Sequence, residues 1–264
     1  MVTLSGVPSN CAVTSGNPQT VTVTGGATMT AAFTVSCSAS AGALTVTTTT
    51  VGASPSSVAT LTLSGPVSAT QPVGINGSVT VQGIPAGSYT VTLSAMPATC
   101  GVTSTSANPQ TITVPALGTV TATFAMQCGE VSGQGQIGTG SPTPGNNVVT
   151  FDFDVRAGLT GRFTGTDYAD LHGTTPATLT TDAAADTATR FTAYRLRSSA
   201  CSDPAAGVEF DAIGREDTGS LVSYTAYFCD DGVAAGSGVF FKVFIPSEGF
   251  SVFGPVTSGD IMKR

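Results

Sequence analysis

The sequence predicts an all-β protein built of tandem β-sandwiches, and three observations support this prediction. Thr, Ser, Gly, Ala and Val dominate the 264 residues, and only 9% of the residues are charged, whereas an average domain has about a quarter. The abundant valine and threonine favour strands and argue against a disordered chain. Short runs of alternating apolar and polar residues recur along the chain, and an early segment of the sequence is repeated later. This length allows two or three domains, each with its own core.

The repeated segment comprises residues 2–37, which recur with a two-residue insertion as residues 91–128. Both copies begin with Val-Thr-Leu-Ser, continue through a proline, a cysteine and Asn-Pro-Gln-Thr, and end with a phenylalanine and a second cysteine. The matched residues are Val2, Thr3, Leu4, Ser5, Pro8, Cys11, Asn17, Pro18, Gln19, Thr20, Phe33 and Cys37, and Val91, Thr92, Leu93, Ser94, Pro97, Cys100, Asn108, Pro109, Gln110, Thr111, Phe124 and Cys128. A spacing of about 90 residues indicates a tandem array of one domain type.

The second copy, residues 38–128, has the pattern of a complete small β-sandwich. Strands are predicted wherever apolar residues alternate: Leu44/Val46, Leu61/Leu63, Val79/Val81, Tyr89/Val91/Leu93, Ile112/Val114 and Val120/Ala122/Phe124/Met126. Asn76-Gly77 predicts a two-residue hairpin turn. Cys128 continues the face of Phe124 and Met126, so we expect its sulfur to point into the core.

The first copy, residues 1–37, is predicted to be an incomplete repeat. It has no counterpart of residues 38–90, and Met1 stands where Thr90 stands in the complete copy. About three strands cannot bury a two-sheet core alone. We therefore expect the missing half to come either from sequence upstream of Met1 or from a neighbouring chain, since strand donation is an established mode of assembly.

Residues 129–147 are rich in Gly, Ser and Pro and predict a linker. Residues 148–264 have a different composition, with most of the aromatic residues of the chain and alternation typical of strands. The expected strands are VVTFDFDVR, TGRFTGTDY, RFTAYRLR, GVEFDAIG, LVSYTAYFC and GVFFKVFI. Glycine-rich turns separate them, which predicts a second, distinct C-terminal β-sandwich.

The six cysteines form three sequential pairs, one in each predicted unit. Cys11 and Cys37 are 26 residues apart; Cys100 and Cys128, and Cys201 and Cys229, are each 28 apart. This arrangement predicts one disulfide per unit and an oxidising compartment. Zinc is the competing interpretation, but the chain has no Cys-X-X-Cys motif and no histidine near the first four cysteines.

The segment GINGSVTVQGIPAGSYTVTLS, at Gly74–Ser94, resembles the hallmark of prealbumin-like, Cna-B-type modules of bacterial surface proteins. Gly83, Pro85, Gly87 and Tyr89 occupy the expected places in that motif. More loosely, VTFDFDVR, an Asp-Asp-Gly turn and the closing SGDI resemble the β-sandwich that often ends secreted bacterial repeat proteins. The resemblance implies immunoglobulin-like sandwiches in an extracellular structural or adhesive protein. Many family members carry a Lys–Asn isopeptide bond, but no lysine precedes Lys242 here, so the disulfides are expected to staple the repeats instead.

Charge distribution excludes several kinds of function. Residues 1–129 contain no Asp, Glu, Lys, Arg or His, and the net charge of −7 arises entirely from Glu130 onward. An acidic chain without a basic cluster does not favour nucleic acid or anionic membranes as partners. No apolar run is long enough to span a bilayer. The single histidine, His172, lies in a polar, turn-like run without a Gly-X-Ser-X-Gly motif, which argues against a serine hydrolase.

Acidic residues of the C-terminal half suggest two further sites. Glu209 and Asp211 alternate with apolar residues, so we expect a solvated strand face rather than the carboxylate pair of a glycosidase. Calcium is a weak alternative, because oxygen clusters suit this ion, although no recognised calcium loop is present and turn aspartates usually bond their own backbone. The calcium candidates are Asp152, Asp154, Asp167, Asp170, Asp230 and Asp231. No other cofactor and no catalytic residue is predicted.

Phe240, Lys242 and Phe244 alternate with Phe241, Val243 and Ile245, so one of these sets should face outward and could contact a partner. The sequence thus predicts an extracellular stalk, fibre or appendage subunit that is not an enzyme. The predicted partners are further copies of the chain or other surface proteins, and strand complementation of residues 1–37 is one route by which the chain could self-assemble. A carbohydrate- or protein-binding module with its site on the C-terminal sandwich is the alternative.

Overall fold

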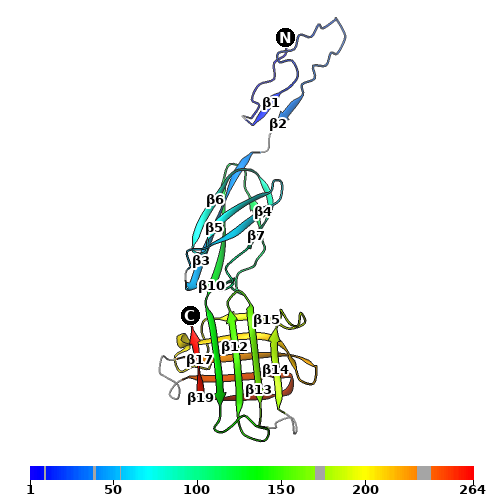
Figure 1. The fold of residues 1–264 in the computed structure, drawn as a ribbon. Helices are drawn as coiled ribbons and strands as arrows, with labels where there is room; N and C mark the ends of the chain where they lie inside the picture. Colours follow the sequence, from blue (N-terminus) through cyan, green and yellow to red (C-terminus); the bar gives the residue numbers. More distant parts are fainter. Residues whose placement is uncertain (9, 38–39, 54, 170–175, 231–238) are drawn as a thin grey trace.

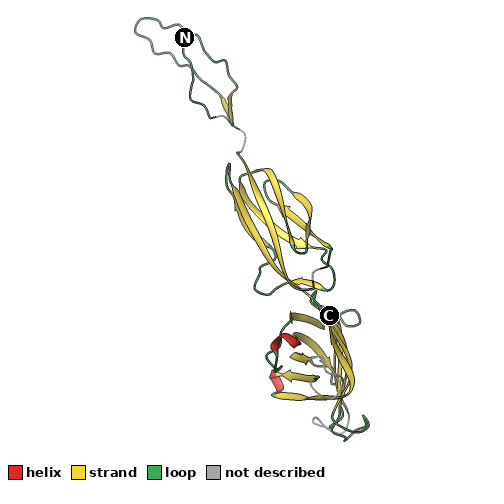
Figure 2. Ribbon diagram, turned by 90° about the vertical axis from the view of Figure 1, so that its left-hand side faces the viewer, coloured by secondary structure: helices red, strands yellow, loops and turns green. Residues whose placement is uncertain are grey.

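A computed structural model of the chain describes all residues except 9, 38–39, 54, 170–175 and 231–238. Three units follow one another along a rod: an N-terminal unit, a middle domain and a C-terminal domain (Figures 1 and 2). Strands make up nearly all of the regular structure, and the helices are two single turns, η1 (Pro204–Ala206) and η2 (Pro246–Glu248). The all-β prediction is confirmed. In the described residues no helix is long and apolar enough to cross a membrane.

The middle domain is a sandwich of two four-stranded sheets, with strand orders β6-β3-β10-β8 and β5-β4-β7-β9. Its strands are β3 (Ala41–Gly52), β4 (Val58–Ser64), β5 (Ala69–Gly74), β6 (Gly77–Pro85), β7 (Gly87–Ser94), β8 (Cys100–Val102), β9 (Gln110–Val114) and β10 (Thr119–Cys128). The alternating apolar residues fill the space between the sheets, with Leu44, Leu61, Tyr89 and Phe124 all buried. β3 and β10 are parallel over ten residue pairs.

The turn predicted at Asn76-Gly77 is present, but it does not form a hairpin within one sheet. It joins β5 of one sheet to β6 of the other. Ile75, in this turn, is buried in the core. The hydroxyl of Thr48 donates to the carbonyl of Gly74 at 2.6 Å and accepts from the amide of Gly77 at 3.0 Å. These hydrogen bonds hold the turn against the space between the two sheets. The Asn-Gly dipeptide predicts a turn, but it does not specify which sheets the turn connects.

The C-terminal domain is one antiparallel sheet of nine strands, in the order β14-β13-β12-β11-β19-β18-β17-β16-β15. Its strands are β11 (Glu130–Ile137), β12 (Val149–Arg156), β13 (Thr160–Asp167), β14 (Ala177–Asp182), β15 (Arg190–Arg195), β16 (Gly207–Glu216), β17 (Leu221–Cys229), β18 (Phe240–Ile245) and β19 (Phe250–Lys263). β14 also pairs with β16, through Leu179–Glu216 and Thr180–Arg215, so the sheet closes on itself. We call this unit the closed sheet.

The closed sheet corrects the expectation of a C-terminal sandwich in one respect: its two layers are parts of a single sheet. β12, β13 and β14 run along the rod, whereas β15 and β17 run across it (Figure 1). β19 connects the layers, because its first half pairs with β18 and its second half with β11. Gly259, with φ 91°, and a register shift at Gln136/Ile137 lie along the β19–β11 pairing. Bends and bulges of this kind let one strand turn a corner, and alternation in the sequence does not reveal them.

The predicted linker at residues 129–147 is wrong in its first part, because β11 occupies Glu130–Ile137 in the middle of the closed sheet. Its glycines have a packing role. A Cβ atom at Gly133 would lie 2.8 Å from the Asp260 carbonyl oxygen, and one at Gly135 would lie 2.2 Å from that of Ser258. Only glycine fits where another backbone comes this close. The strand is therefore rich in glycine, and its composition resembles that of a flexible linker.

Candidate functional site

The N-terminal unit has two short strands, β1 (Cys11–Val13) and β2 (Val35–Cys37), and repeats the local hydrogen bonds of residues 91–128. Asn17 accepts from the amide of Leu4 and donates to its carbonyl, at 3.0 and 2.9 Å. Asn108 makes the same two bonds to Leu93, at the same distances. Cys11 and Cys100 each donate through the backbone to the proline three residues earlier. The first 37 residues thus have the local conformation of half a sandwich.

The apolar side chains of this half-sandwich are exposed where their repeat mates are buried. Val2 is 44% exposed, whereas its mate Val91 is 0% exposed. Val23 is 70% exposed, and its mate Val114 is 1% exposed. In the middle domain the strands of residues 41–85 cover this face, and the described part of the chain holds no second set of such strands.

The N-terminal unit also has an open strand edge. In the middle domain β10 lies between β8 and β3. Its counterpart, β2, pairs with β1, the counterpart of β8, and with no other strand of the described residues. Val35, on β2, is exposed, whereas its repeat mate Met126 on β10 is buried. An open edge beside exposed apolar residues can accept a further strand.

A second feature is the junction between the middle domain and the closed sheet, which Gly129 alone spans. β10 ends at Cys128 and β11 begins at Glu130. The amide of Gly129 donates to Thr99 at 2.8 Å, and its carbonyl accepts from Ala157 at 3.0 Å. Gly158 donates to Ala98 at 3.0 Å. The backbones of the two domains are therefore hydrogen-bonded directly to each other.

Packing at the junction is close. A Cβ atom at Gly101 would lie 2.4 Å from the Ala157 carbonyl oxygen, and one at Gly158 would lie 2.3 Å from that of Ala98. The Gln127 side chain donates to the backbone carbonyl of Tyr194 across the junction. Burial raises the pKa of Tyr194, and its hydroxyl has no hydrogen-bond partner among the described residues. These contacts oppose bending of one domain against the other.

The third feature is the outer face of β18, where the structure places the predicted partner residues Phe240, Lys242 and Phe244 together. Phe241, Val243 and Ile245 point into the core instead. Phe253 lies opposite Lys242 on β19 and is 66% exposed, with its ring centroid 6.4 Å from that of Phe240. The Lys242 ammonium lies 5.1 Å from the centre of the Tyr227 ring. We call these residues the aromatic face.

Two of the acidic candidates for a calcium site form ion pairs with arginines. Asp152 binds Arg162 at 3.1 Å, and Asp154 binds Arg156 at 2.6 Å. No group of three or more potential metal ligands occurs in the described residues. Asp167 borders a cavity discussed below, and Asp230 follows β17. Asp170, Asp231 and His172 lie outside the described residues.

The predicted solvated pair Glu209 and Asp211 lies on one face of β16, as the alternation indicates, with both side chains held by Arg195. Desolvation by itself would lower the pKa of Arg195, but the hydrogen bond to Asp211 and the charges of Asp211, Glu209 and Tyr227 together raise it. Glu216 and Asp217 lie at the end of β16 and in the following turn. This arrangement fits an ion-pair network on a strand.

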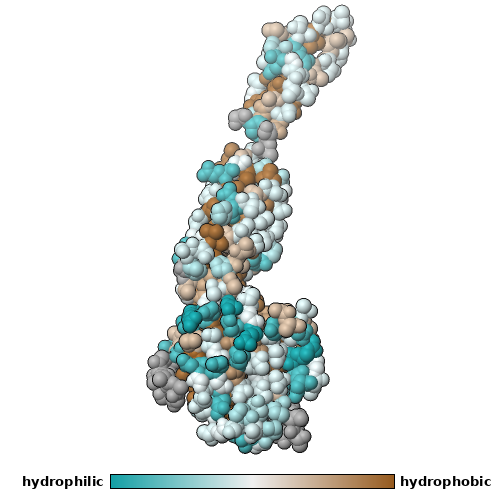
Figure 3. Space-filling view, viewed as in Figure 1, coloured by the Kyte–Doolittle hydropathy of each residue, from teal (hydrophilic) through white to brown (hydrophobic). Residues whose placement is uncertain are grey.

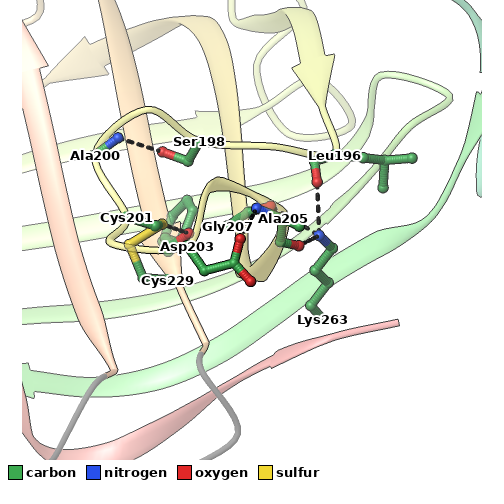
Figure 4. The surroundings of a disulfide bond; sticks show 10 residues. Leu196, Ser198, Ala200, Cys201, Asp203, Ala205, Gly207, Cys229 and Lys263 are labelled. Carbon is green, nitrogen blue, oxygen red and sulfur yellow. Dashed lines mark hydrogen bonds between the residues drawn. A yellow bond between two sulfur atoms is a disulfide. The ribbon is translucent and has the colours of Figure 1, made fainter.

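The disulfides join Cys11 to Cys37, Cys100 to Cys128 and Cys201 to Cys229, the three predicted pairs. Beside the third, the ammonium of Lys263 donates to the carbonyls of Leu196, Ala205 and Gly207 at 2.7, 2.6 and 3.0 Å (Figure 4). Desolvation lowers the pKa of Lys263. The sequence offers no signal for this contact, since carbonyl acceptors can come from any residue.

No protein-family model and no curated protein matches the chain. Among solved structures it is similar to the minor pilin GBS52 of Streptococcus agalactiae, at 13% identity over 40% of this chain and 48% of that one, with a TM-score of 0.29. The Bacillus anthracis TIE protein is 9% identical over 86% and 50% of the two chains (TM-score 0.32). The Corynebacterium diphtheriae major pilin SpaD is 9% identical over 83% and 64% (TM-score 0.32). The chain spans about half the length of the first two. At such low TM-scores we rest no functional statement on these similarities.

Proposed function

We propose that this chain is an extracellular structural protein, a stalk or spacer subunit of a surface appendage. The observation that carries the proposal is the junction at Gly129, where a single residue and direct backbone hydrogen bonds join two β-domains end to end. A subunit that keeps two surfaces at a fixed separation needs such a stiff connection.

Surface chemistry supports the same role. The N-terminal unit and the middle domain carry no charged side chain, and their surfaces are mostly of intermediate hydropathy, while strongly hydrophilic residues gather on the closed sheet (Figure 3). Uncharged neighbours do not repel one another, so subunits can pack closely. One disulfide in each unit resists unfolding outside the cell, where thiols are oxidised.

The stiffness can be tested by small-angle X-ray scattering on the full chain. A six-residue Gly-Ser insertion after Gly129 should broaden the distribution of interatomic distances, because it breaks the backbone contacts between the domains. The same insertion in the loop after Gly140 is the matched control and should leave the distribution unchanged. A wild-type profile as broad as that of the Gly129 insertion would refute a stiff rod. Immunogold labelling of source cells then tests the location, and an intracellular signal would refute the appendage role.

The finer proposal is that a neighbouring subunit completes residues 1–37 by donating strands. The exposed Val2, Val23 and Val35, together with the open edge of β2, support it. The donated strand would lie parallel to β2, as β3 lies parallel to β10 in the middle domain.

Val35→Asp places a charge on the apolar face of this unit and should abolish the concentration-dependent increase in mass seen by mass photometry. Val51→Asp, at an exposed position of the middle domain, is the matched control and should assemble like the wild type. A wild-type chain that is well folded and strictly monomeric at all concentrations would refute assembly through residues 1–37. It would leave the stiff-rod proposal intact.

The second candidate function is ligand binding by the aromatic face, because Phe253 is largely exposed beside Phe240 and Lys242. Carbohydrates and proteins both bind exposed aromatic rings. A glycan array and a pull-down with the full chain test this, with Phe253→Ser as the variant. A fragment starting at residue 148 is unsuitable, since it lacks β11 of the closed sheet. Equal capture by the wild type and Phe253→Ser would refute this site.

A further inference from the structure

The closed sheet contains an apolar cavity at one of its ends. The cavity has a volume of about 70 Å³ and is partly open to solvent. Side chains of β12, β13, β14, β18 and β19 line it, among them Val149, Phe163, Leu179, Phe241, Ile245 and Val252. Nearly all of its exposed lining is apolar. Such a cavity can hold a small apolar group and gains free energy by excluding water.

This end of the closed sheet is remote from the rest of the chain. Val149, at the start of β12, pairs with Asp167 at the end of β13. The opposite end of β12 leads into Ala157 and Gly158, which contact the middle domain. The cavity therefore lies at the tip of the rod, where a ligand or partner can approach it without meeting the other domains.

Asp167 gives the cavity its chemical character. The residue is only 7% exposed and borders the cavity. Its Oδ1 accepts from the amide of Ala169 at 2.8 Å, but its Oδ2 is buried and has no hydrogen-bond partner among the described residues. A buried carboxylate oxygen without a donor is costly, so burial of Asp167 is favoured only if a donor can reach it.

The other charged residues that line the cavity are Glu216 and Asp217, which are also acidic. No Lys or Arg among the described residues lines it, and His172 lies outside those residues. Arg215 precedes the lining residue Glu216 in the sequence, but its guanidinium Nε donates to the Asp186 carboxylate at 2.6 Å. In the part of the chain that the structure describes, the cavity thus has apolar walls and only acidic charged side chains. It should favour a cation and reject an anion of the same shape.

We propose that this cavity binds a small hydrophobic amine, with the ammonium group donating to Asp167 and the alkyl group in the apolar space. An engineered cavity of about 150 Å³ holds the six carbons of benzene, so a cavity of about 70 Å³ suits a chain of about three carbons. The proposal concerns recognition at the tip and is independent of how the rod assembles.

The test uses the full chain and three probes of similar shape: n-propylamine, 1-propanol and propionate. In isothermal titration calorimetry the amine should bind at least about tenfold more tightly than the alcohol, since a charged hydrogen bond contributes more than a neutral one. Propionate should not bind. Equal binding of amine and alcohol, or no binding of the amine at millimolar concentration, would overturn the proposal.

Asp167→Asn tests the residue itself, because it keeps the shape and removes the charge. It should weaken amine binding at least about tenfold and leave alcohol binding unchanged. Asp260→Asn, at an exposed position of β19 outside the cavity lining, is the matched control and should change the affinity less than about threefold. If Asp167→Asn does not fold, carboxyl ¹³C NMR of the wild type decides. The Asp167 signal must then be the one that shifts most on addition of amine, and an unchanged signal refutes the site.

Discussion

Removing the Phe124 side chain should destabilise the middle domain, whereas removing that of its repeat mate Phe33 should not. Phe124 is 0% exposed in the core between the two sheets. Phe33 occupies the same place in the N-terminal unit but is only partly buried. The two substitutions, Phe124→Ala and Phe33→Ala, are chemically identical and differ only in what surrounds the ring.

The size of the effect follows from burial. A buried phenylalanine removes about 150–250 Å² from water, which at about 25 cal/mol per Å² gives about 4–6 kcal/mol. Alanine keeps part of this burial, and measured Phe→Ala changes in cores are about 3–5 kcal/mol. For Phe33→Ala we expect less than about 1 kcal/mol, as for most surface positions.

Differential scanning calorimetry of the oxidised chain is the assay. A loss of about 3–5 kcal/mol of unfolding free energy should lower the Tm of the middle domain by at least about 12 °C. Each kcal/mol corresponds to about 4–8 °C in a domain of fewer than 100 residues. The closed sheet has a separate core and provides an internal reference. A shift of less than about 4 °C for Phe124→Ala, or equal shifts for both variants, would refute the assignment of a complete and an incomplete sandwich.

Three further predictions concern the junction and the closed sheet. Gly158→Ala forces a methyl group against the Ala98 carbonyl oxygen. Small-angle X-ray scattering should then show a wider range of domain orientations, while both domains keep their Tm values. An unchanged scattering profile would contradict the role of this glycine. Because desolvation lowers the pKa of Lys263, the folded state loses the Lys263 proton at a lower pH than the unfolded chain does. The free energy of unfolding should therefore rise as the pH approaches 10.5. Lys263→Met should remove that rise in urea titrations. The comparison must stop below pH 10, because burial raises the pKa values of Tyr194 and Tyr224. Above that pH these tyrosines ionise in the unfolded chain but not in the folded one, which lowers stability for a separate reason. Tyr224→Phe removes one of the two hydrogen-bond partners of the Thr181 hydroxyl, the other being the Ile213 carbonyl. It should cost about 1 kcal/mol in urea unfolding, and no measurable change would contradict a stabilising role of this hydrogen bond.

Much of the middle domain was predictable because each of its signals is local. Alternation placed Leu44, Leu61 and Phe124 in the core, and all are buried. The Pro85–Tyr89 motif was also informative, since the Tyr89 hydroxyl donates to the Pro85 carbonyl at 2.9 Å and the ring is buried. In these places the residue types alone determine which face is apolar.

The errors occurred where a distant partner decides the outcome. Gly133 and Gly135 have the composition of a linker, but neighbouring backbone on β19 makes them part of a strand. Similarly, alternation in β18 showed that Phe240 and Phe241 face opposite ways, but it could not say which one is buried. Both answers depend on which strands lie beside them.

The sequence by itself determined the all-β class, the three cysteine pairs and the similarity of residues 2–37 to residues 91–128, because periodicity, spacing and self-similarity are properties of the chain alone. Only the tertiary structure decided that the C-terminal sheet closes, that Gly129 joins two domains without a linker, and that Asp167 borders an apolar cavity. Each of these depends on backbone or side chains brought together from strands far apart in the sequence, and local preference carries no information about such neighbours.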